Sequence, residues 1–308
     1  QCPNVNKMVN ALEDVEFIVG QDNFLTPTVR YADIVLPATT FWERNDVHTP
    51  WAGAGHYVIY MAKAIEPVAE CRNDIDIFAD LAARVGISGY NELCEQAWLR
   101  QLTAHAVDDF EQLREQGVAR LPAPADAVAF AGFIRDPERQ PLATPSGKIE
   151  IYSTTLGENS NPYGLGEISP IPTWAPVPGR DADYPLALCS PKSRARTHSV
   201  HGNQPRLARV DVDDVWIHAD DAAARGIRDG EQVRIFNSYG QTRLPAKVTD
   251  RIARGVVSIK EGAWHTPDAK GHDTAGCANV LSADRSAPCG ATTYNTNFVE
   301  ISRLPKAH

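Results

Sequence analysis

The order of apolar and polar residues predicts an α/β unit at the start of the chain. Two short apolar runs, "DVEFIVGQDNF" (residues 14–24) and "ADIVLPATT" (32–40), are typical of strands, because turn-forming residues bound each of them. The segment "TPTVRYAD" between them predicts a short helix. In "NDIDIFADLAARVGIS" (73–88) apolar residues recur every three or four positions, which indicates an amphipathic helix. Asn73 or Asp74 is suited to cap its start, and a glycine ends it.

Helical patterns continue in "NELCEQAWLRQL" and "DDFEQLREQG", up to residue 117. The chain then becomes rich in Pro and Ala until "TPSGKIEIYS" (144–153), where we expect a turn followed by a strand. Residues 157–185 have the Pro and Gly density of an ordered connector. We therefore expect a domain boundary near residue 180.

After this boundary the pattern changes to short strands. Two glycine turns, Asp229-Gly230 and Tyr239-Gly240, separate some of them, and "ADDAAARG" is the clear helix. The strand-like segments are "YPLALC", "DVWIH", "EQVRIFN", "TRLPAKVT", "GVVSIK" and "NFVEI". Six strands and one short helix favour a closed barrel over a sheet covered by helices.

The length, the net charge and the cysteine spacing of the chain argue against several classes of protein and of metal site. A chain of 308 residues exceeds the usual size of one hydrophobic core, so two domains are expected. The formal net charge of -9 argues against nucleic-acid binding, since phosphate contacts need a basic surface. No apolar run is long enough to span a membrane, and no signal segment opens the chain. The six cysteines are scattered without a C-x-x-C pair, so we expect buried apolar thiols rather than a zinc or iron–sulfur site.

One window departs from the acidic composition. Residues 184–210 contain five Lys or Arg and no Asp or Glu, and "CSPKSRARTHSVHGN" within them follows a predicted strand. Arginine forks beside short hydroxyls suit a phosphate or pyrophosphate. A solvated basic surface loop explains the same composition equally well. His198 and His201 have the spacing of metal ligands on a helical turn, but no third ligand is near, so ordinary hydrogen-bonding histidines are favoured.

Further candidates stand at the ends of predicted elements. Trp264 follows a predicted strand and is able to stack on a planar ring, although loop tryptophans are more often packing anchors. Asn279 carries the donors and acceptor that read the edge of a heterocycle. In the first domain Gln21, Asp22, Arg44 and Asp74 lie where α/β sheets bind ribose or base, and Asp74 is equally explained as a helix cap. No G-x-S-x-G elbow supports a hydrolase.

Taken together and in order, several segments resemble the molybdopterin oxidoreductases of the dimethyl sulfoxide reductase family, C-terminal half. Within that family the resemblance points to the catalytic A subunit of anaerobic dimethyl sulfoxide reductases. It extends over nearly the whole chain and is weakest between about residues 95 and 135. The segments that carry it are "VEFIVGQDNFLTPTVRYADIVLPATTFWERND", "TPSGKIEIYSTTL", "KSRARTHSVHGN", "DVWIHADDAAARGIRDGEQVRIFNSYGQTRLPAKVTDRIARGVV", "EGAWHTPD" and "GCANVLS".

This resemblance implies a fold and a cofactor. The fold class is an α/β N-terminal domain, part of a Rossmann-like nucleotide-binding domain, followed by a mainly β double-psi β-barrel. Residues 1–90 would be the partial α/β molybdopterin-nucleotide domain, 91–180 a helical and Pro/Gly-rich connecting segment, and 181–308 the barrel that binds molybdopterin dinucleotide. The implied cofactor is molybdenum bis(molybdopterin guanine dinucleotide). Two pyrophosphate tails would explain a basic loop in an acidic protein.

The resemblance also assigns cofactor-binding residues, position by position. In the basic loop they are Ser190, Lys192, Arg194, Arg196, Thr197, His198 and Ser199. Later in the chain they are Trp264, Asn279, Asn295 and Thr296. Those expected on the guanosine side of the first domain are Gln21, Asp22, Arg44 and Asp74.

No catalytic or metal-ligating residue is expected in this chain. The family's iron–sulfur cysteines and its molybdenum ligand would lie before Gln1, and none of the six cysteines replaces them by spacing. The implied activity of the complete enzyme is reduction of an S-oxide or N-oxide by oxygen-atom transfer. Its implied partners are a small-molecule oxide, the rest of the catalytic subunit, an iron–sulfur subunit and a membrane anchor, and its implied location is the periplasm. Arsenate, selenate, tetrathionate or formate chemistry, or a non-catalytic module that binds an anion or a partner protein, are the alternatives.

Overall fold

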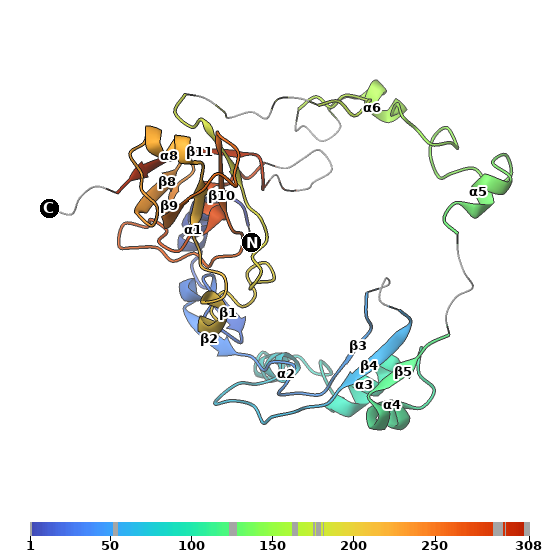
Figure 1. The fold of residues 1–308 in the computed structure, drawn as a ribbon. Coiled ribbons are helices and arrows are strands. Elements are labelled where there is room, and N and C mark those ends of the chain that lie inside the picture. Colours follow the sequence, from blue (N-terminus) through green and yellow to red (C-terminus); the bar gives the residue numbers. More distant parts are fainter. Residues whose placement is uncertain are drawn as a thin grey trace. The chain divides into compact units, whose positions relative to one another are not determined.

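The computed structural model describes residues 2–51, 55–122, 128–161, 166–174, 176, 180, 182–285, 292 and 294–304. The chain divides into two compact units (Figure 1): unit 1 comprises residues 1–16 and 142–308, and unit 2 comprises residues 17–141. The domain limits at residues 90 and 180 stay a prediction. No helix within the described ranges is both long and apolar enough to cross a membrane.

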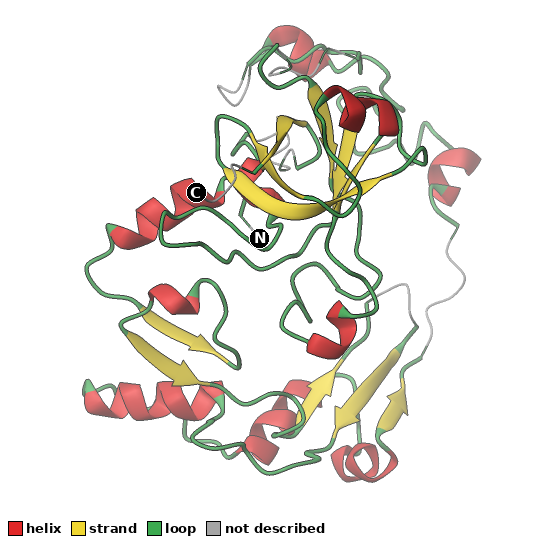
Figure 2. Cartoon of the chain, turned by 60° about the vertical axis from the view of Figure 1, so that its left-hand side comes forward, coloured by secondary structure: helices red, strands yellow, loops and turns green. Residues whose placement is uncertain are grey.

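Unit 1 is built on a closed six-stranded barrel (Figure 2). All six strands lie where the sequence predicts them, and they follow the order β10-β6-β11-β8-β9-β7 around the barrel. The β6–β10 and β7–β9 pairs are parallel, and the other four are antiparallel. The strands are β6 (Leu186–Cys189), β7 (Val215–Ile217), β8 (Gln232–Phe236), β9 (Gln241–Val248), β10 (Val256–Ile259) and β11 (Asn297–Arg303).

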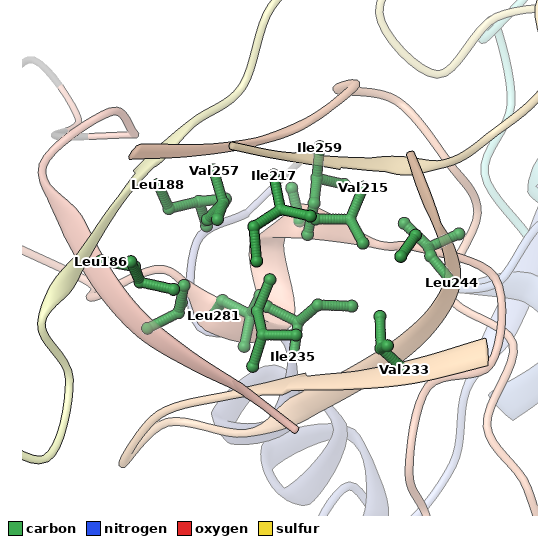
Figure 3. Close-up of a cluster of buried hydrophobic side chains, with 14 of the residues drawn as sticks. Leu186, Leu188, Val215, Ile217, Val233, Ile235, Leu244, Val257, Ile259 and Leu281 are labelled. Carbon is green, nitrogen blue, oxygen red and sulfur yellow. The ribbon is translucent and has the colours of Figure 1, made fainter. Parts of the chain in front are cut away.

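The barrel closes around side chains that point inward from alternate strand positions, and most of these side chains are apolar. Burial alternates along β9 and β11 in this way. In Figure 3 Leu188, Ile217 and Ile235, from three different strands, point toward one another in the interior, and each is at most 1% exposed. Burying one such side chain stabilises the fold by about 1.5–3 kcal/mol. The interior is thus a packed core, and binding residues must sit at the ends of the barrel.

Unit 1 also contains short helices, and some of them pack on the barrel core. The predicted helix α8 (Ala219–Ala224) follows β7. Helix α1 (Val5–Glu13) was not predicted, and it packs on the barrel through Val5 and a hydrogen bond of 2.8 Å from Asn6 Nδ2 to Tyr239 O. The other helices of unit 1 are α6 (Thr154–Glu158), α7 (Pro205–Ala208) and the 3-10 helix η3 (Ala278–Leu281).

The strand expected in residues 144–153 does not form. The preceding turn is present, with Gly147 at a φ of 68°. Ile149 and Ile151 are 76% and 77% exposed, and within the described residues no strand pairs with them. The prediction was wrong because alternating apolar residues form a strand only where a partner completes the ladder.

Unit 2 begins with the predicted α/β unit. Strands β1 (Val19–Asp22) and β2 (Ile34–Pro37) pair in parallel, joined through the 3-10 helix η1 (Val29–Tyr31). Helix α2 (Asp74–Arg84) also forms as predicted, with the side chain of Asn73 accepting a hydrogen bond of 3.1 Å from Ile75 N.

A three-stranded antiparallel sheet in unit 2 was not predicted. Its strands are β3 (Asp46–His48), β4 (Tyr57–Met61) and β5 (Val118–Arg120). The predicted helices pack against it through a core that includes Val58, Leu99 and Leu113. They are α3 (Glu95–Thr103) and α4 (Phe110–Gln116), and α5 (Ala131–Arg135) follows.

The apolar stripe of α2 remains uncovered in this chain. Ile75, Phe78, Leu81 and Val85 are between 43% and 62% exposed. Helical spacing predicted that these side chains face a core. The described residues supply no such core for them.

Candidate functional site

Three segments of the chain meet at one end of the barrel. Strands β6 and β10 are parallel neighbours, so the loops that follow them leave the barrel at the same end. β7 runs antiparallel to β10, so the residues just before β7 lie there too. We call this meeting point of residues 190–203, 211–214 and 260–264 the loop end of the barrel. A hydrogen bond of 3.0 Å from Glu261 N to Pro191 O joins two of the segments.

Arg196 is buried at the loop end and already has a partner. Its side chain is 8% exposed. It donates two hydrogen bonds of 2.7 Å to the carboxylate of Asp213, and a third of 3.1 Å to Glu261 O. The hydrogen bonds to Asp213 raise the pKa of Arg196 above its usual value. The sequence suggested Arg196 as a phosphate contact, but the structure uses its terminal nitrogens in an internal ion pair.

Lys192 and His198 share a second carboxylate. Lys192 Nζ lies 2.8 Å from Glu261 Oε1, and His198 Nδ1 lies 3.2 Å from the same oxygen. Both basic side chains are more than half exposed. Solvent weakens such a pair, so these two side chains remain accessible to a ligand.

Asp211 connects all three segments. Its Oδ2 accepts hydrogen bonds from Ser193 Oγ at 2.7 Å and Arg194 N at 2.9 Å, and its Oδ1 lies 2.9 Å from Lys260 Nζ. Burial alone would raise the pKa of Asp211. The hydrogen bonds from Ser193, Lys260 and Arg194 outweigh that effect and hold this pKa at about 2. Asp211 is therefore charged at neutral pH and holds the three segments together.

Part of the loop is left without internal partners. Within the described residues no hydrogen bond or ion pair involves the exposed guanidinium of Arg194 or the hydroxyls of Ser190, Thr197 and Ser199. The guanidinium groups of Arg206 and Arg209, further along, are likewise unpaired there. The loop end thus separates inner cations, which the protein neutralises itself, from outer donors, which it leaves available.

The two histidines do not lie on a helical turn. Thr197 and Val200 exchange backbone hydrogen bonds of 3.3 and 3.0 Å, which closes a tight turn. His198 and His201 adopt left-handed backbone angles, with φ of 53° and 71°. No group of His, Cys, Asp or Glu in the described ranges is arranged to hold a metal ion.

Trp264 holds the basic loop through a hydrogen bond and through packing of its ring. Its Nε1 donates a hydrogen bond of 2.8 Å to Ser199 O. A Cβ on Gly202 would lie 2.7 Å from the Trp264 ring, so the ring rests on the main chain at that glycine. The packing-anchor interpretation of Trp264 therefore has direct structural support.

The later candidates fall in two places. Asn295 lies at the loop end, where its Oδ1 accepts a hydrogen bond of 3.0 Å from Ser190 N, and Thr296 follows it just before β11. Asn279 lies in η3, and its Nδ2 donates a hydrogen bond of 3.1 Å to Cys2 O. Only the first of these contacts belongs to the basic loop.

In unit 2 the structure brings three of the four candidates together. Gln21 Nε2 donates a hydrogen bond to Asp74 Oδ1, and Arg44 Nη1 lies 4.0 Å from Asp74 Oδ2. This cluster stands at the carboxyl ends of β1 and β2, the edge where α/β sheets bind ligands. Asp22 behaves as a turn cap, because its Oδ1 accepts a hydrogen bond of 2.8 Å from Asn23 N.

Sequence reasoning missed several polar residues at these sites. Thr39 is 4% exposed, and its hydroxyl has no hydrogen-bond partner in the described part of the chain. His265 is 7% exposed, and its Nε2 is also unpartnered there. The acidic run "DVDDV" contains Asp211 and Asp213 and begins directly after the basic window of residues 184–210. Its position beside that window was a usable signal for ion pairs with the basic residues.

Two protein-family models match this chain. The model described as "Molybdopterin oxidoreductase" matches residues 1–84, which include the cluster around Gln21 and Asp74. The model described as "Molydopterin dinucleotide binding domain" matches residues 186–298, which include the loop end of the barrel.

Known proteins are similar over almost the whole chain. The dimethyl sulfoxide reductase DmsA of Haemophilus influenzae is 36% identical over 326 residues, which cover 99% of this chain and 40% of that protein. DmsA of Escherichia coli is also 36% identical, over 99% of this chain and 40% of its own length. A dimethyl sulfoxide/trimethylamine N-oxide reductase of Rhodobacter capsulatus is 36% identical over 91% of this chain and 36% of its own length. The chain thus spans about 40% of the DmsA relatives.

A solved structure shares the fold. Acetylene hydratase from Pelobacter acetylenicus aligns with a TM-score of 0.72 at 20% identity, covering 98% of this chain and 42% of that one. This likeness concerns the fold alone. The two family models and the relatives at 36% identity show that the chain belongs to the molybdopterin oxidoreductase family.

Proposed function

We propose that this chain is the cofactor-binding part of a molybdenum-dependent oxidoreductase that reduces an S-oxide or N-oxide by oxygen-atom transfer. The support for this substrate class comes from the relatives, which are named as reductases of dimethyl sulfoxide and trimethylamine N-oxide. The chain spans about 40% of the DmsA relatives, and its own part in the reaction is to hold the cofactor.

One observation carries this proposal: four donor side chains of the basic loop have no partner among the described residues. The guanidinium of Arg194 and the hydroxyls of Ser190, Thr197 and Ser199 match the oxygen atoms of a pyrophosphate. Lys192 and His198 add exposed basic groups beside them. Each charge-assisted contact of this kind contributes about 1.5–3 kcal/mol, so a few of them are enough to anchor a dinucleotide.

The residues present therefore fit the tail of a molybdopterin dinucleotide. When bound, the cofactor supplies two-electron oxygen-atom chemistry that no side chain provides. Arg196 serves by fixing the loop, and Trp264, Asn295 and Thr296 border or support it. We assign Asn279 to the same cofactor on the strength of the family resemblance.

We further propose the guanine form of the cofactor, in two copies per metal. Gln21, Arg44 and Asp74 would contact a guanosine at the edge of β1 and β2, where an Asp carboxylate is able to accept hydrogen bonds from a base. Asp22 would support the turn beside them. From the family resemblance we also propose that residues 1–90 are part of a Rossmann-like nucleotide-binding domain, residues 91–180 a connecting segment and residues 181–308 a double-psi β-barrel.

The remaining features of the whole enzyme are proposals from family resemblance. An iron–sulfur cluster and the molybdenum ligand would belong to the rest of the catalytic subunit. An iron–sulfur subunit and a membrane anchor would deliver electrons, and the enzyme would act in the periplasm.

Metal and nucleotide analysis of the native protein that contains this chain tests the proposal. After anaerobic growth with molybdate, we expect molybdenum and about two guanine nucleotides per metal atom on acid release. Reduced viologen should be oxidised by an S-oxide or an N-oxide and not by arsenate, selenate or tetrathionate, and formate should not reduce oxidised viologen. Absence of molybdenum, tungsten and guanine nucleotide would overturn the proposal.

A further inference from the structure

We propose that Asp211 and Asp213 are positioning residues for the anion site: they lock the basic loop in its binding conformation and leave the Arg194 side chain exposed to a ligand. This inference rests on the proposed function. It assigns a role to two acidic residues that lie outside the cation-rich loop and are not expected to touch the ligand.

Asp213 fixes the middle of the loop through Arg196. Two parallel hydrogen bonds of 2.7 Å hold the guanidinium plane in one orientation. The bond of 3.1 Å from Arg196 Nη2 to Glu261 O ties the same side chain to the segment after β10. Because the side chain is 8% exposed, it is unable to swing out and follow a ligand without breaking these contacts.

Asp211 fixes the residues just before this point. It holds the backbone N–H of Arg194 at 2.9 Å and the hydroxyl of Ser193 at 2.7 Å. Ser193 Oγ in turn accepts a hydrogen bond of 3.1 Å from Ala195 N. The main chain on both sides of Arg194 is therefore immobilised, while the guanidinium of Arg194 stays exposed.

Asp211 and Asp213 also determine which basic side chains at the loop end are paired. Arg196 is paired with Asp213, and Lys260 lies 2.9 Å from Asp211 and 3.4 Å from Asp214. The inner cations are thus neutralised. The main chain at Arg194 is held in place while its guanidinium is exposed, so a phosphate that binds there restricts less main-chain motion.

The barrel provides a matched control pair. Arg225 donates to Glu300 at 2.5 and 3.0 Å, with side chains 19% and 24% exposed. Arg225 follows α8, which begins where β7 leaves the barrel, so this pair lies away from the loop end. Glu300→Gln should therefore cost stability without touching the loop.

The experiment compares Asp211→Asn, Asp213→Asn and Glu300→Gln in the full 308-residue chain. Hydrogen exchange of residues 190–203 is measured without nucleotide, and GDP affinity is measured by calorimetry. We expect exchange of the loop amides to rise at least tenfold and GDP affinity to fall at least tenfold in both loop-end variants. Glu300→Gln should lower the melting temperature and leave loop exchange and GDP affinity at wild-type values.

Each result decides the matter. Unchanged loop exchange in both loop-end variants, or a rise equal to that in Glu300→Gln, would overturn the positioning role. If the wild-type chain does not bind GDP, the proposed function fails, while the exchange measurement still decides whether the carboxylates hold the loop. Should Asp213→Asn not fold, Asp213→Glu with Arg196→Lys keeps the charges but loses the two-point geometry, and it should show the same rise in loop exchange.

Discussion

Gly262 and His198 approach so closely that no side chain fits between them. A Cβ on Gly262 would lie 1.7 Å from His198 O and 2.6 Å from the carbonyl carbon of the same residue. Both residues also have left-handed backbone angles, with φ of 89° and 53°. The main chain of the basic loop therefore rests directly on the segment that follows β10.

This approach predicts a large effect of Gly262→Ala. Since the clashing atoms are backbone, the loop must shift, and we expect a loss of at least about 2 kcal/mol in the free energy of unfolding. Gly230→Ala is the control, because Gly230 has φ of 76° but nothing within 4 Å of a built Cβ, so only backbone strain of about 1 kcal/mol is expected. Urea unfolding measures both, and equal losses would contradict the clash.

The depressed pKa of Asp211 predicts that the folded protein loses stability in acid. Its folded-state pKa of about 2 is depressed below the usual value, so its contribution to stability is complete above about pH 4 and is lost as the pH falls from 4 to 2. The shift corresponds to about 2 kcal/mol. Asp211→Asn should thus be less stable than the wild type by about that amount at pH 7, and the difference should shrink between pH 4 and 2.

Urea titrations of wild type and variant at pH 7, 4 and 3 measure that difference. Asp250→Asn, at a carboxylate whose side chain is 81% exposed, provides the control and should show little difference at any pH. A constant difference between wild type and Asp211→Asn would show that the charge of Asp211 is not responsible.

His265 predicts a pH effect in another range. Burial lowers the pKa of His265, so the folded protein binds its proton less well than the unfolded chain does. The contribution of neutral His265 to the free energy of unfolding is therefore complete above about pH 6.5 and decreases as the pH falls below that value. His265→Gln should remove this part of the slope. Melting temperatures of both proteins between pH 8 and 5.5 test it, and parallel curves would count against a buried neutral histidine.

Cys277 should be unreactive in the folded protein. Burial, with a smaller effect of Asp273, raises the pKa of Cys277 to about 12, whereas Cys94 and Cys189 are exposed, so the expectation of buried thiols was wrong for these two. At pH 8 we expect iodoacetamide to label Cys277 at least about a hundredfold more slowly than Cys189. Mass spectrometry of the labelled peptides follows the reaction, and denatured protein should erase the difference. Fast labelling of native Cys277 would refute the burial of this thiol.

Local pattern predicted most of the fold, and it failed where structure depends on distant segments. The barrel strands were predictable because each is a short run rich in apolar residues, as β7 and β10 are. The pairing of Tyr57 with Arg120 joins strands about sixty residues apart, which no local pattern shows. Helix α1 was predictable in principle, since Val5, Met8 and Leu12 have helical spacing.

The sequence predicted which basic residues belong to the site, but not which of them pair with carboxylates. The sequence identified the basic loop, yet it did not show that Asp213 pairs with Arg196 and that Glu261 lies beside Lys192. Those contacts arise from the parallel pairing of β6 with β10, a property of the barrel and not of the loop. Consequently Arg194, rather than Arg196, is the more accessible cation.

GDP binding by this chain tests most directly whether the loop end holds a nucleotide tail. At about ten times its Kd, GDP should stabilise the fold by about 1.4 kcal/mol, which raises the melting temperature by about 3–6 °C. Arg194→Ala should weaken GDP at least tenfold and so abolish most of this rise, whereas Arg228→Ala, at an exposed arginine after α8, should keep it. No rise in the wild type, or an equal rise in Arg194→Ala, would contradict the account.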